Sequence, residues 1–256
     1  MRNQISRLWM AWILASLLAL PAFASQPAQS SKPNDQKIQQ EVNKQLQDNN
    51  AWKNVQANVS NGVVTLTGTV DVFRDKAKLD EKIRKRNGVA DLRDDVLVAG
   101  ASVSDLKLQE TLADKLRYDR INFGHVFNNL TLDVKDGVAT VGGTVRTPVD
   151  KSSALSEVTN TPGVKGVVDQ IKVAPTSIFD DRLRLEIARA IYRRLPPGYA
   201  LDPQAPIRIV VVNGNVDLYG VVDSKLDRQI AEVQARSVPG VFSVNDHLLL
   251  PSETNQ

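Results

Sequence analysis

The apolar residues of this chain follow two rhythms, and the same succession of rhythms occurs three times. A four-residue spacing, typical of one face of a helix, comes first in each copy. It is carried by Ile38, Val42 and Leu46, then Leu108, Leu112 and Leu116, then Leu183, Ile187 and Ile191. Alternating apolar and polar residues, typical of half-buried strands, follow on both sides of Asn61-Gly62, Asp136-Gly137 and Asn213-Gly214. Because Asn-Gly and Asp-Gly tolerate positive φ, each alternating stretch predicts a β-hairpin.

Glycines set the length of the repeat. In each copy three glycines are spaced by 6 and then 20 residues, and an aspartate follows 6 residues after the third. The glycines are Gly62, Gly68 and Gly88, then Gly137, Gly143 and Gly163, then Gly214, Gly220 and Gly240; the aspartates are Asp94, Asp169 and Asp246. We expect the middle glycine of each set to let a helix approach the sheet closely or to form a bulge. A feature present in all three copies is expected to serve the fold, so a feature of one copy is the better functional candidate.

A second helix and a last strand complete each copy. The helix begins near Val72, Thr147 and Ser224 and ends at the third glycine, where a left-handed cap is possible. The strand covers residues 92–98, 167–173 and 244–250. Each unit is therefore predicted to be αββαβ, an α+β fold with two helices on one face of a three-stranded mixed sheet. The predicted domains span residues 35–99, 104–174 and 178–250, with a flexible leader at 25–34 and a tail at 251–256.

The hairpin segments and the closing strand are similar to a known family. The segments at residues 61–70, 136–145 and 213–222, each followed later by Gly-Val and an Asp-containing apolar strand, resemble the BON domain (bacterial OsmY and nodulation). Copies two and three have the Pro-Gly-Val form, whereas copy one has Asn87-Gly88-Val89. The resemblance implies envelope proteins of bacteria, generally without catalysis. It implies attachment to phospholipid membranes, protection under osmotic stress, or activity as a periplasmic chaperone.

The first 24 residues have the layout of a secretory signal peptide. Arg2 and Arg7 precede the apolar run Leu8–Leu20, and Ala22-Phe23-Ala24 places small residues at a cleavage site before Ser25. The alternative is a retained anchor, but the apolar run is shorter than the roughly 20 residues that span a bilayer. We therefore expect a periplasmic protein. Removing the signal's two arginines leaves 30 basic against 29 acidic residues, so attraction to nucleic acid or membranes must come from local patches.

Catalytic and metal-binding chemistry has little support in the sequence. Cysteine is absent, which removes thiol catalysis and thiolate metal sites. Neither His125 nor His247 has a second histidine nearby, and Asp246 points to the opposite face of the strand from His247. Gly163-Val-Lys-Gly166 matches a KH-type loop but joins a helix to a strand. We therefore expect no enzyme, no cofactor, no metal, no nucleic acid and no small-molecule substrate, and we read the three repeated aspartates as structural.

Basic helices that occur in single copies are the candidate binding sites. The first helix of copy three carries Arg182, Arg184, Arg189, Tyr192, Arg193 and Arg194; the second helix of copy one carries Lys76, Lys78, Lys82, Arg84, Lys85 and Arg86. Basic amphipathic helices bind anionic headgroups, and an aromatic residue accompanies the charge in copy three. The leading hypothesis is attachment to an anionic phospholipid surface. The alternative for either helix is a solvated face with internal ion pairs.

Copy three also has an unusually apolar sheet. Its first strand, 207–212, is apolar on both faces, and its second strand points Tyr219 and Val221 outward. A sheet with helices on one face is normally polar on the other. We expect this outer face to be covered by another copy or by a partner, which gives a second functional hypothesis: a periplasmic chaperone or scaffold that binds envelope proteins.

Overall fold

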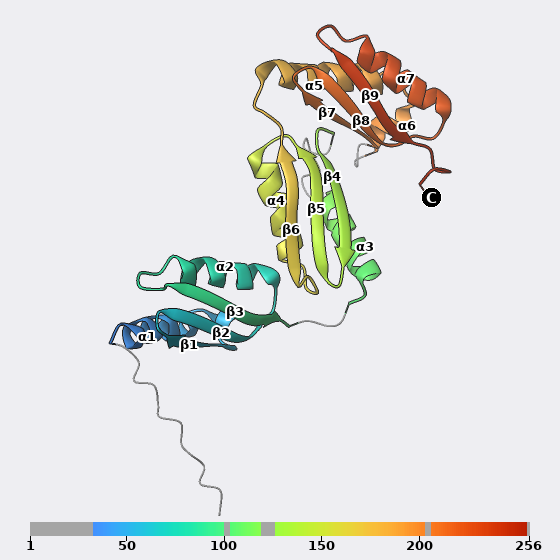
Figure 1. The fold of residues 1–256 in the computed structure, drawn as a ribbon. Coiled ribbons are helices and arrows are strands. Elements are labelled where there is room, and N and C mark those ends of the chain that lie inside the picture. The colour runs from blue at the N-terminus through green and yellow to red at the C-terminus, as the bar shows by residue number, and fades with distance from the viewer. Residues whose placement is uncertain (1–32, 100–102, 119–125, 203–205, 255–256) are drawn as a thin grey trace, which may run out of the picture.

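The computed structural model describes residues 33–99, 103–118, 126–202 and 206–254, and it contains three αββαβ units in succession (Figure 1). Copy one consists of α1 (Pro33–Gln47), the 3-10 turn η1 (Asn50–Trp52), β1 (Val55–Ser60), β2 (Val63–Val70), α2 (Phe73–Arg84) and β3 (Asp91–Val98). Copy two consists of α3 (Asp105–Tyr118), β4 (Asn129–Lys135), β5 (Val138–Val145), α4 (Pro148–Thr159) and β6 (Gly166–Val173). Copy three consists of α5 (Ile178–Tyr192), α6 (Pro197–Leu201), β7 (Ile207–Val212), β8 (Asn215–Val221), α7 (Lys225–Arg236) and β9 (Ser243–Leu249).

The three sheets have the predicted mixed topology. In each copy the second strand is central, pairs antiparallel with the first and parallel with the third. The two long helices of a copy pack on the same sheet face (Figure 1). The hairpin residues Asn61, Asp136 and Asn213 have φ of 52°, 54° and 52°, as the Asn-Gly and Asp-Gly pairs predicted. The predicted signal peptide, residues 25–32 of the predicted flexible leader and His125 lie outside the described residues. The leader's last two residues, Pro33 and Asn34, are not a flexible segment, because α1 begins at Pro33.

An aspartate near the start of the first helix anchors each hairpin. Asp35, Asp105 and Asp180 each accept two hydrogen bonds from the backbone N–H groups of the turn, at 2.7 to 2.9 Å. Asp180 is fully buried, and its partners are the N–H groups of Asn213 and Gly214. A carboxylate that accepts backbone N–H groups makes strong, charge-assisted bonds. This side chain therefore fixes the position of the first helix against the hairpin.

The repeated aspartates of the last strand are structural, as expected. One oxygen of Asp94, Asp169 and Asp246 accepts the N–H two residues on, at 2.8 to 3.0 Å. The other pairs with a basic residue in the first turn of the second helix, namely Lys76, Lys151 and Arg228 at 3.1, 2.8 and 2.6 Å. The same ion pair thus ties the second helix to the last strand in every copy.

The middle glycines allow a close approach, but the approaching group is not a helix. Gly68, Gly143 and Gly220 have φ of 116°, 97° and 129°. A Cβ on each would lie about 2 Å from a carbonyl oxygen at the beginning of the first strand, at 2.1 Å from Asn54, 2.1 Å from Asn129 and 1.9 Å from Pro206. The expectation of a close helix was therefore wrong, because the neighbouring strand's backbone occupies that space.

Each copy encloses its own hydrophobic core, and two phenylalanines cross from one copy to the next. Phe73, at the start of α2, packs against the core of copy two. Phe127, which precedes β4 in copy two, is 6% exposed and belongs to the core of copy three. The backbone supports this second junction, because the Ile209 N–H on the edge of β7 donates to the Val126 carbonyl. Copy two therefore satisfies one backbone N–H group on the edge of copy three.

Candidate functional site

The candidate helix α5 covers one face of the copy-three sheet, and its two sides differ. Leu183, Ile187 and Ile191 form the buried side, at 2% exposure or less. Ser177 caps the first turn by accepting the Asp180 N–H, which satisfies one of the free donors at the helix start. Of the six residues predicted to meet lipid, four are exposed: Arg182, Arg189, Arg193 and Arg194.

The remaining two predicted residues are bonded to the adjacent strand, Arg184 as a buried side chain and Tyr192 as a partly buried one. Arg184 is 3% exposed, and its guanidinium donates to Asp181 and to the Val211 carbonyl. The Tyr192 hydroxyl donates to the Ile207 carbonyl at 3.0 Å and accepts the Ile207 N–H. Burial raises the pKa of Tyr192 to about 12. These two side chains hold α5 to β7, so their assignment as lipid contacts is corrected.

The exposed side of α5 combines apolar and basic side chains. Ile178 and Leu185 are 83% and 42% exposed. They are seven residues apart, so they lie on one stripe of the helix. Arg182, Arg189 and Arg193 project within the same third of the helix circumference. The solvent-facing side of α5 is therefore itself amphipathic, which the buried stripe alone did not reveal.

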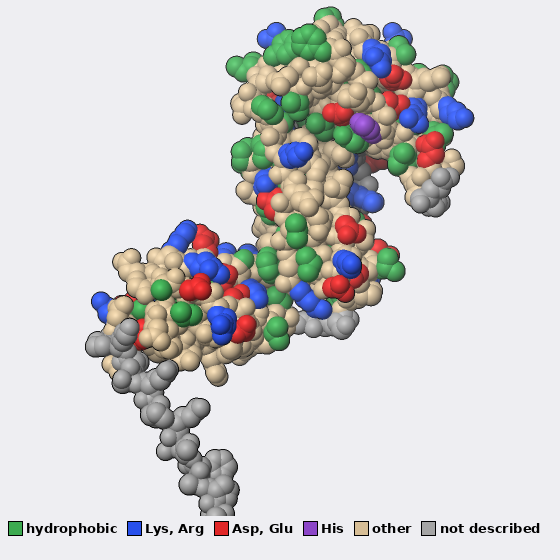
Figure 2. All heavy atoms as spheres, in the orientation of Figure 1, with side chains coloured by type: hydrophobic (Ala, Val, Ile, Leu, Met, Phe, Trp, Pro, Cys, Tyr) green, Lys and Arg blue, Asp and Glu red, His purple; other side chains and the backbone are tan. Residues whose placement is uncertain are grey.

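Two exposed aromatic residues extend this surface at the start of α5. Phe179 is 50% exposed and lies against Gly240; Phe242 is 79% exposed and lies against Gly214. The carbonyl of Gly240 is itself close to Gly214, so the two rings flank one glycine-rich corner. Figure 2 shows hydrophobic side chains gathered at this end of copy three, over the loop before β9 and the start of α5.

The aromatic corner is particular to copy three. Asn34 and Ser104 occupy the position of Phe179, and Ala90 and Lys165 occupy the position of Phe242. α7, which packs beside α5, adds Leu226 and Val233 at 64% and 59% exposure. Sequence analysis missed these apolar residues because they lie outside the buried stripes. Comparing the copies position by position gives the signal that would have found them.

Most basic side chains of the second candidate patch, on α2, form contacts within copy one. Lys76 pairs with Asp94, and Arg86 hydrogen-bonds Glu41 and Gln45. Arg84 and Lys85 form ion pairs along the helix with Asp80 and Glu81, at 3.7 and 2.5 Å. The Lys82 ammonium lies 5.2 Å from the centre of the Trp52 ring, and Lys78 is exposed. This face fits the alternative reading of a solvated helix with internal ion pairs.

The outer sheet face of copy three is covered in part by copy two. Val210 faces outward but is 5% exposed, and the adjacent outward residue Arg208 lies among copy-two side chains. Farther from this junction Val221 and Leu249 stay exposed, at 40% and 43%. The expectation of coverage by another copy is thus met on β7 alone.

His247 lies on this open part of the sheet. Its ring stacks on Tyr219 with centroids 4.6 Å apart, and Nε2 is 3.3 Å from the Asp217 carboxylate. Asp246 points the other way, to Arg228. Within the described ranges, no group of three or more His, Cys, Asp or Glu side chains is arranged to hold a metal ion. No helix in those ranges is long and apolar enough to cross a membrane.

Comparison with known proteins identifies the family. The sequence model of the BON domain matches residues 34–100, 104–175 and 185–251. No curated protein matches the chain. Among solved structures, CdsD, a structural protein of the type III secretion system of Chlamydia trachomatis, is 14% identical over 86% of this chain and 95% of its own, with a TM-score of 0.24. Its C-terminal domain is 14% identical over 82% of this chain and 96% of its own, also with a TM-score of 0.24. The three tandem matches show that this chain belongs to the BON domain family.

Proposed function

We propose that this protein attaches to anionic phospholipid surfaces of the bacterial envelope through the helical layer of copy three, and that this attachment supports envelope integrity. The observation that carries the proposal is the exposed side of α5, where Ile178 and Leu185 alternate with arginines. Membership in the BON family, which is associated with phospholipid binding and osmotic stress, supports the same class of ligand.

The two kinds of side chain have complementary roles at a membrane surface. Each basic residue held near an anionic leaflet contributes roughly 1 kcal/mol, and this attraction is screened by salt. Ile178, Phe179 and Phe242 supply an apolar corner that enters the boundary between headgroups and acyl chains. Because arginines surround the corner along α5, the charge steers the surface to the membrane and the apolar side chains hold it there.

Sedimentation with liposomes tests the proposal. The chain from Ser25 onward is mixed with phosphatidylglycerol-containing or purely zwitterionic vesicles at low and moderate salt. We expect salt-sensitive pelleting with the anionic vesicles only. Reversal of the three stripe arginines (Arg182→Glu, Arg189→Glu and Arg193→Glu) is expected to abolish it. Because all three side chains are exposed, the variant is expected to fold normally, which circular dichroism checks.

A matched triple variant in copy one distinguishes the loss of the α5 surface from the change in the protein's net charge. Lys78→Glu, Lys82→Glu and Arg84→Glu change the charge by the same amount on exposed positions of α2. We expect this variant to pellet like the parent protein. Equal losses in the two triple variants would show that charge alone matters and would refute the assignment to α5.

The second candidate, a chaperone or scaffold, has support from one observation. Val221 and Leu249 leave an apolar patch exposed on the outer sheet face, beside the stacked Tyr219 and His247. Exposed apolar patches mark protein-binding surfaces. Absence of pelleting under every condition, together with salt-resistant binding of unfolded envelope proteins that Leu249→Ser weakens, would favour this function.

A further inference from the structure

The three copies close the same end of their cores in three different ways. In copy one the Trp52 side chain fills the space between the end of α1 and the start of α2, and its Nε1 donates to the Asp75 carbonyl. In copy three Tyr199 from α6 closes this end, with its hydroxyl 3.3 Å from Asp227, the equivalent of Asp75. An aromatic side chain thus closes the core in both copies.

Copy two has the aromatic residue but places it elsewhere. Phe127 stands 16 residues before Gly143, as Trp52 stands 16 residues before Gly68. This equivalent position predicts that the Phe127 side chain closes the same end of the copy-two core. Its ring instead packs in the core of copy three. Among the residues that the structure describes, none takes over the place of Trp52.

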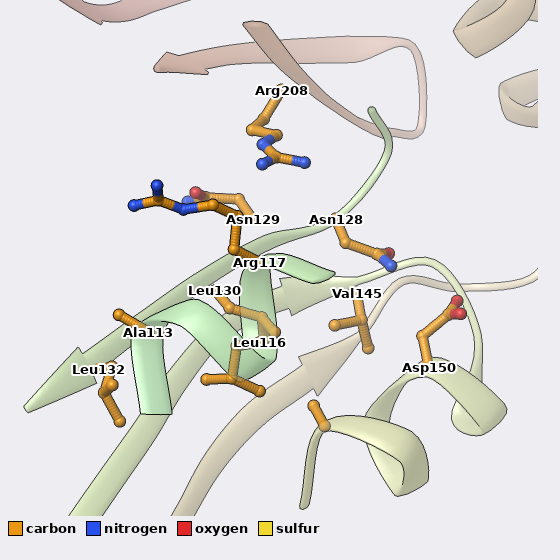
Figure 3. Close-up of a pocket in the computed structure, with 11 residues that line it drawn as sticks. Ala113, Leu116, Arg117, Asn128, Asn129, Leu130, Leu132, Val145, Asp150 and Arg208 are labelled. Atoms are coloured by element: carbon orange, nitrogen blue, oxygen red, sulfur yellow. The ribbon is translucent and has the colours of Figure 1, made fainter. Parts of the chain in front are cut away.

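A cavity of about 210 Å³ occupies the corresponding place in copy two (Figure 3). Apart from Ala113, which aligns with Asn43, its apolar walls occupy positions that in copy one belong to the core cluster around Trp52. They are formed by Ala113, Leu116, Leu130, Leu132, Val145 and Ala154. Ala154 stands where copy one has the larger Leu79, which widens the space. Leu116 and Leu130 are partly exposed, whereas their copy-one equivalents Leu46 and Val55 are buried.

The mouth of the cavity is polar and carries positive charge. Arg117 comes from the last turn of α3, and Arg208 reaches in from β7 of copy three (Figure 3). Burial, together with the nearby charge of Arg117, lowers the pKa of Arg208, and Tyr192 and Asp202 act in the opposite direction. Among the residues that the structure describes, the carboxylates near this mouth are Asp150, which caps α4 by accepting the Thr147 N–H, and Asp202. An anion placed between the arginines would offset their mutual repulsion.

We propose that this cavity binds a small organic acid with an apolar body, a short alkyl or phenyl carboxylate. The apolar part takes the place that Trp52 fills in copy one, and the carboxylate meets Arg117 and Arg208 at the mouth. An apolar cavity of about 150 Å³ is already large enough for benzene, so one ring or a short chain fits. Because Arg208 belongs to copy three, the ligand would bridge the two copies. This inference is independent of membrane attachment.

Calorimetric titration of the chain from Ser25 onward, without lipid, tests the inference. The probes are 3-phenylpropionate and octanoate, which distinguish a ring from a chain, and the neutral 3-phenylpropanol. We expect at least one acid to bind and the alcohol to bind about tenfold or more weakly, because it lacks the charge-assisted bonds. Arg117→Gln and Arg208→Gln are each expected to weaken the acid and leave the alcohol unchanged.

Filling the cavity gives the sharper test. Ala154→Leu introduces the side chain that copy one accommodates at this position, so the variant is expected to fold and to lose binding of both acids. Lys172→Gln, at an exposed position on β6, removes a charge outside the cavity and is expected to bind like the parent protein. Unchanged binding in Ala154→Leu, or no binding of either acid to the parent protein, would overturn the inference.

Discussion

At the residue scale, a charged or aromatic side chain in a helix can face either the core or the solvent, and register decides which. Arg184 and Tyr192 look like members of a basic, aromatic surface in the sequence, but both donate to backbone carbonyls of β7. Arg182 and Arg189, two and three positions from them, face solvent. Since a turn of helix has 3.6 residues, a shift of two positions moves a side chain to the far side.

The Tyr192 hydroxyl provides a prediction for alkaline pH. Burial raises the pKa of this group from 10.0 to about 12, so the folded protein holds the proton more tightly than the unfolded chain. Its contribution to stability is therefore complete below pH 10 and is lost as the pH rises towards 12. We expect the free energy of unfolding, measured by urea denaturation, to fall across this range.

Tyr192→Phe supplies the control for this prediction. The variant loses both hydrogen bonds to Ile207, so it is expected to be about 1 kcal/mol less stable at neutral pH and to show a smaller alkaline loss. Its pelleting with anionic vesicles is expected to equal that of the parent protein. Reduced pelleting at unchanged stability would return Tyr192 to the lipid-binding surface.

At the element scale, the sequence predicted almost the whole architecture. Periodicity and glycine spacing are sufficient for the helices and strands because each copy repeats the same local rules, such as the Asn61-Gly62 turn at φ of 52° and 77°. The candidate site was less predictable. Phe242 lies in a loop and Ile178 at a helix start, where no periodicity indicates burial or exposure. The close contact between Gly143 and a carbonyl of the adjacent strand was likewise not predictable, because it depends on how the two strands are aligned.

Gly143 gives a stability prediction for this strand contact. Its φ is 97°, and an added Cβ would lie 2.1 Å from the Asn129 carbonyl oxygen, which is backbone and cannot turn aside. Gly143→Ala is expected to destabilise copy two by at least about 3 kcal/mol, because strain and a steric clash add. Gly198→Ala, in α6 with no atom within 4 Å of the new Cβ, is expected to have little effect. Similar unfolding midpoints in urea for the two variants would contradict this account.

At the scale of the whole molecule, each junction between copies contains a phenylalanine of one copy that packs against the core of the next copy. Phe73 of copy one packs on the core of copy two, and Phe127 of copy two packs in the core of copy three. The Arg146–Asp181 ion pair, at 3.0 Å, also joins copies two and three. The Arg146 guanidinium lowers the pKa of Asp181. Sequence comparison aligns Phe127 with Trp52 and so predicts the wrong core for it. Periodicity describes one unit at a time, whereas the choice between two cores depends on how neighbouring units dock.

Phe127→Ala tests whether copies two and three behave as one folding unit. The side chain is 6% exposed in the copy-three core, and truncating a buried phenylalanine typically costs 3–5 kcal/mol. We expect hydrogen exchange to accelerate in β7, β8 and β9, although the substitution lies in copy two, and to change less in β4 to β6. Phe73→Ala, which removes a half-buried ring at the other junction, is expected to have a smaller effect. Loss of protection confined to copy two would mean that Phe127 serves its own copy, and it would also remove the basis for the cavity that its displacement leaves.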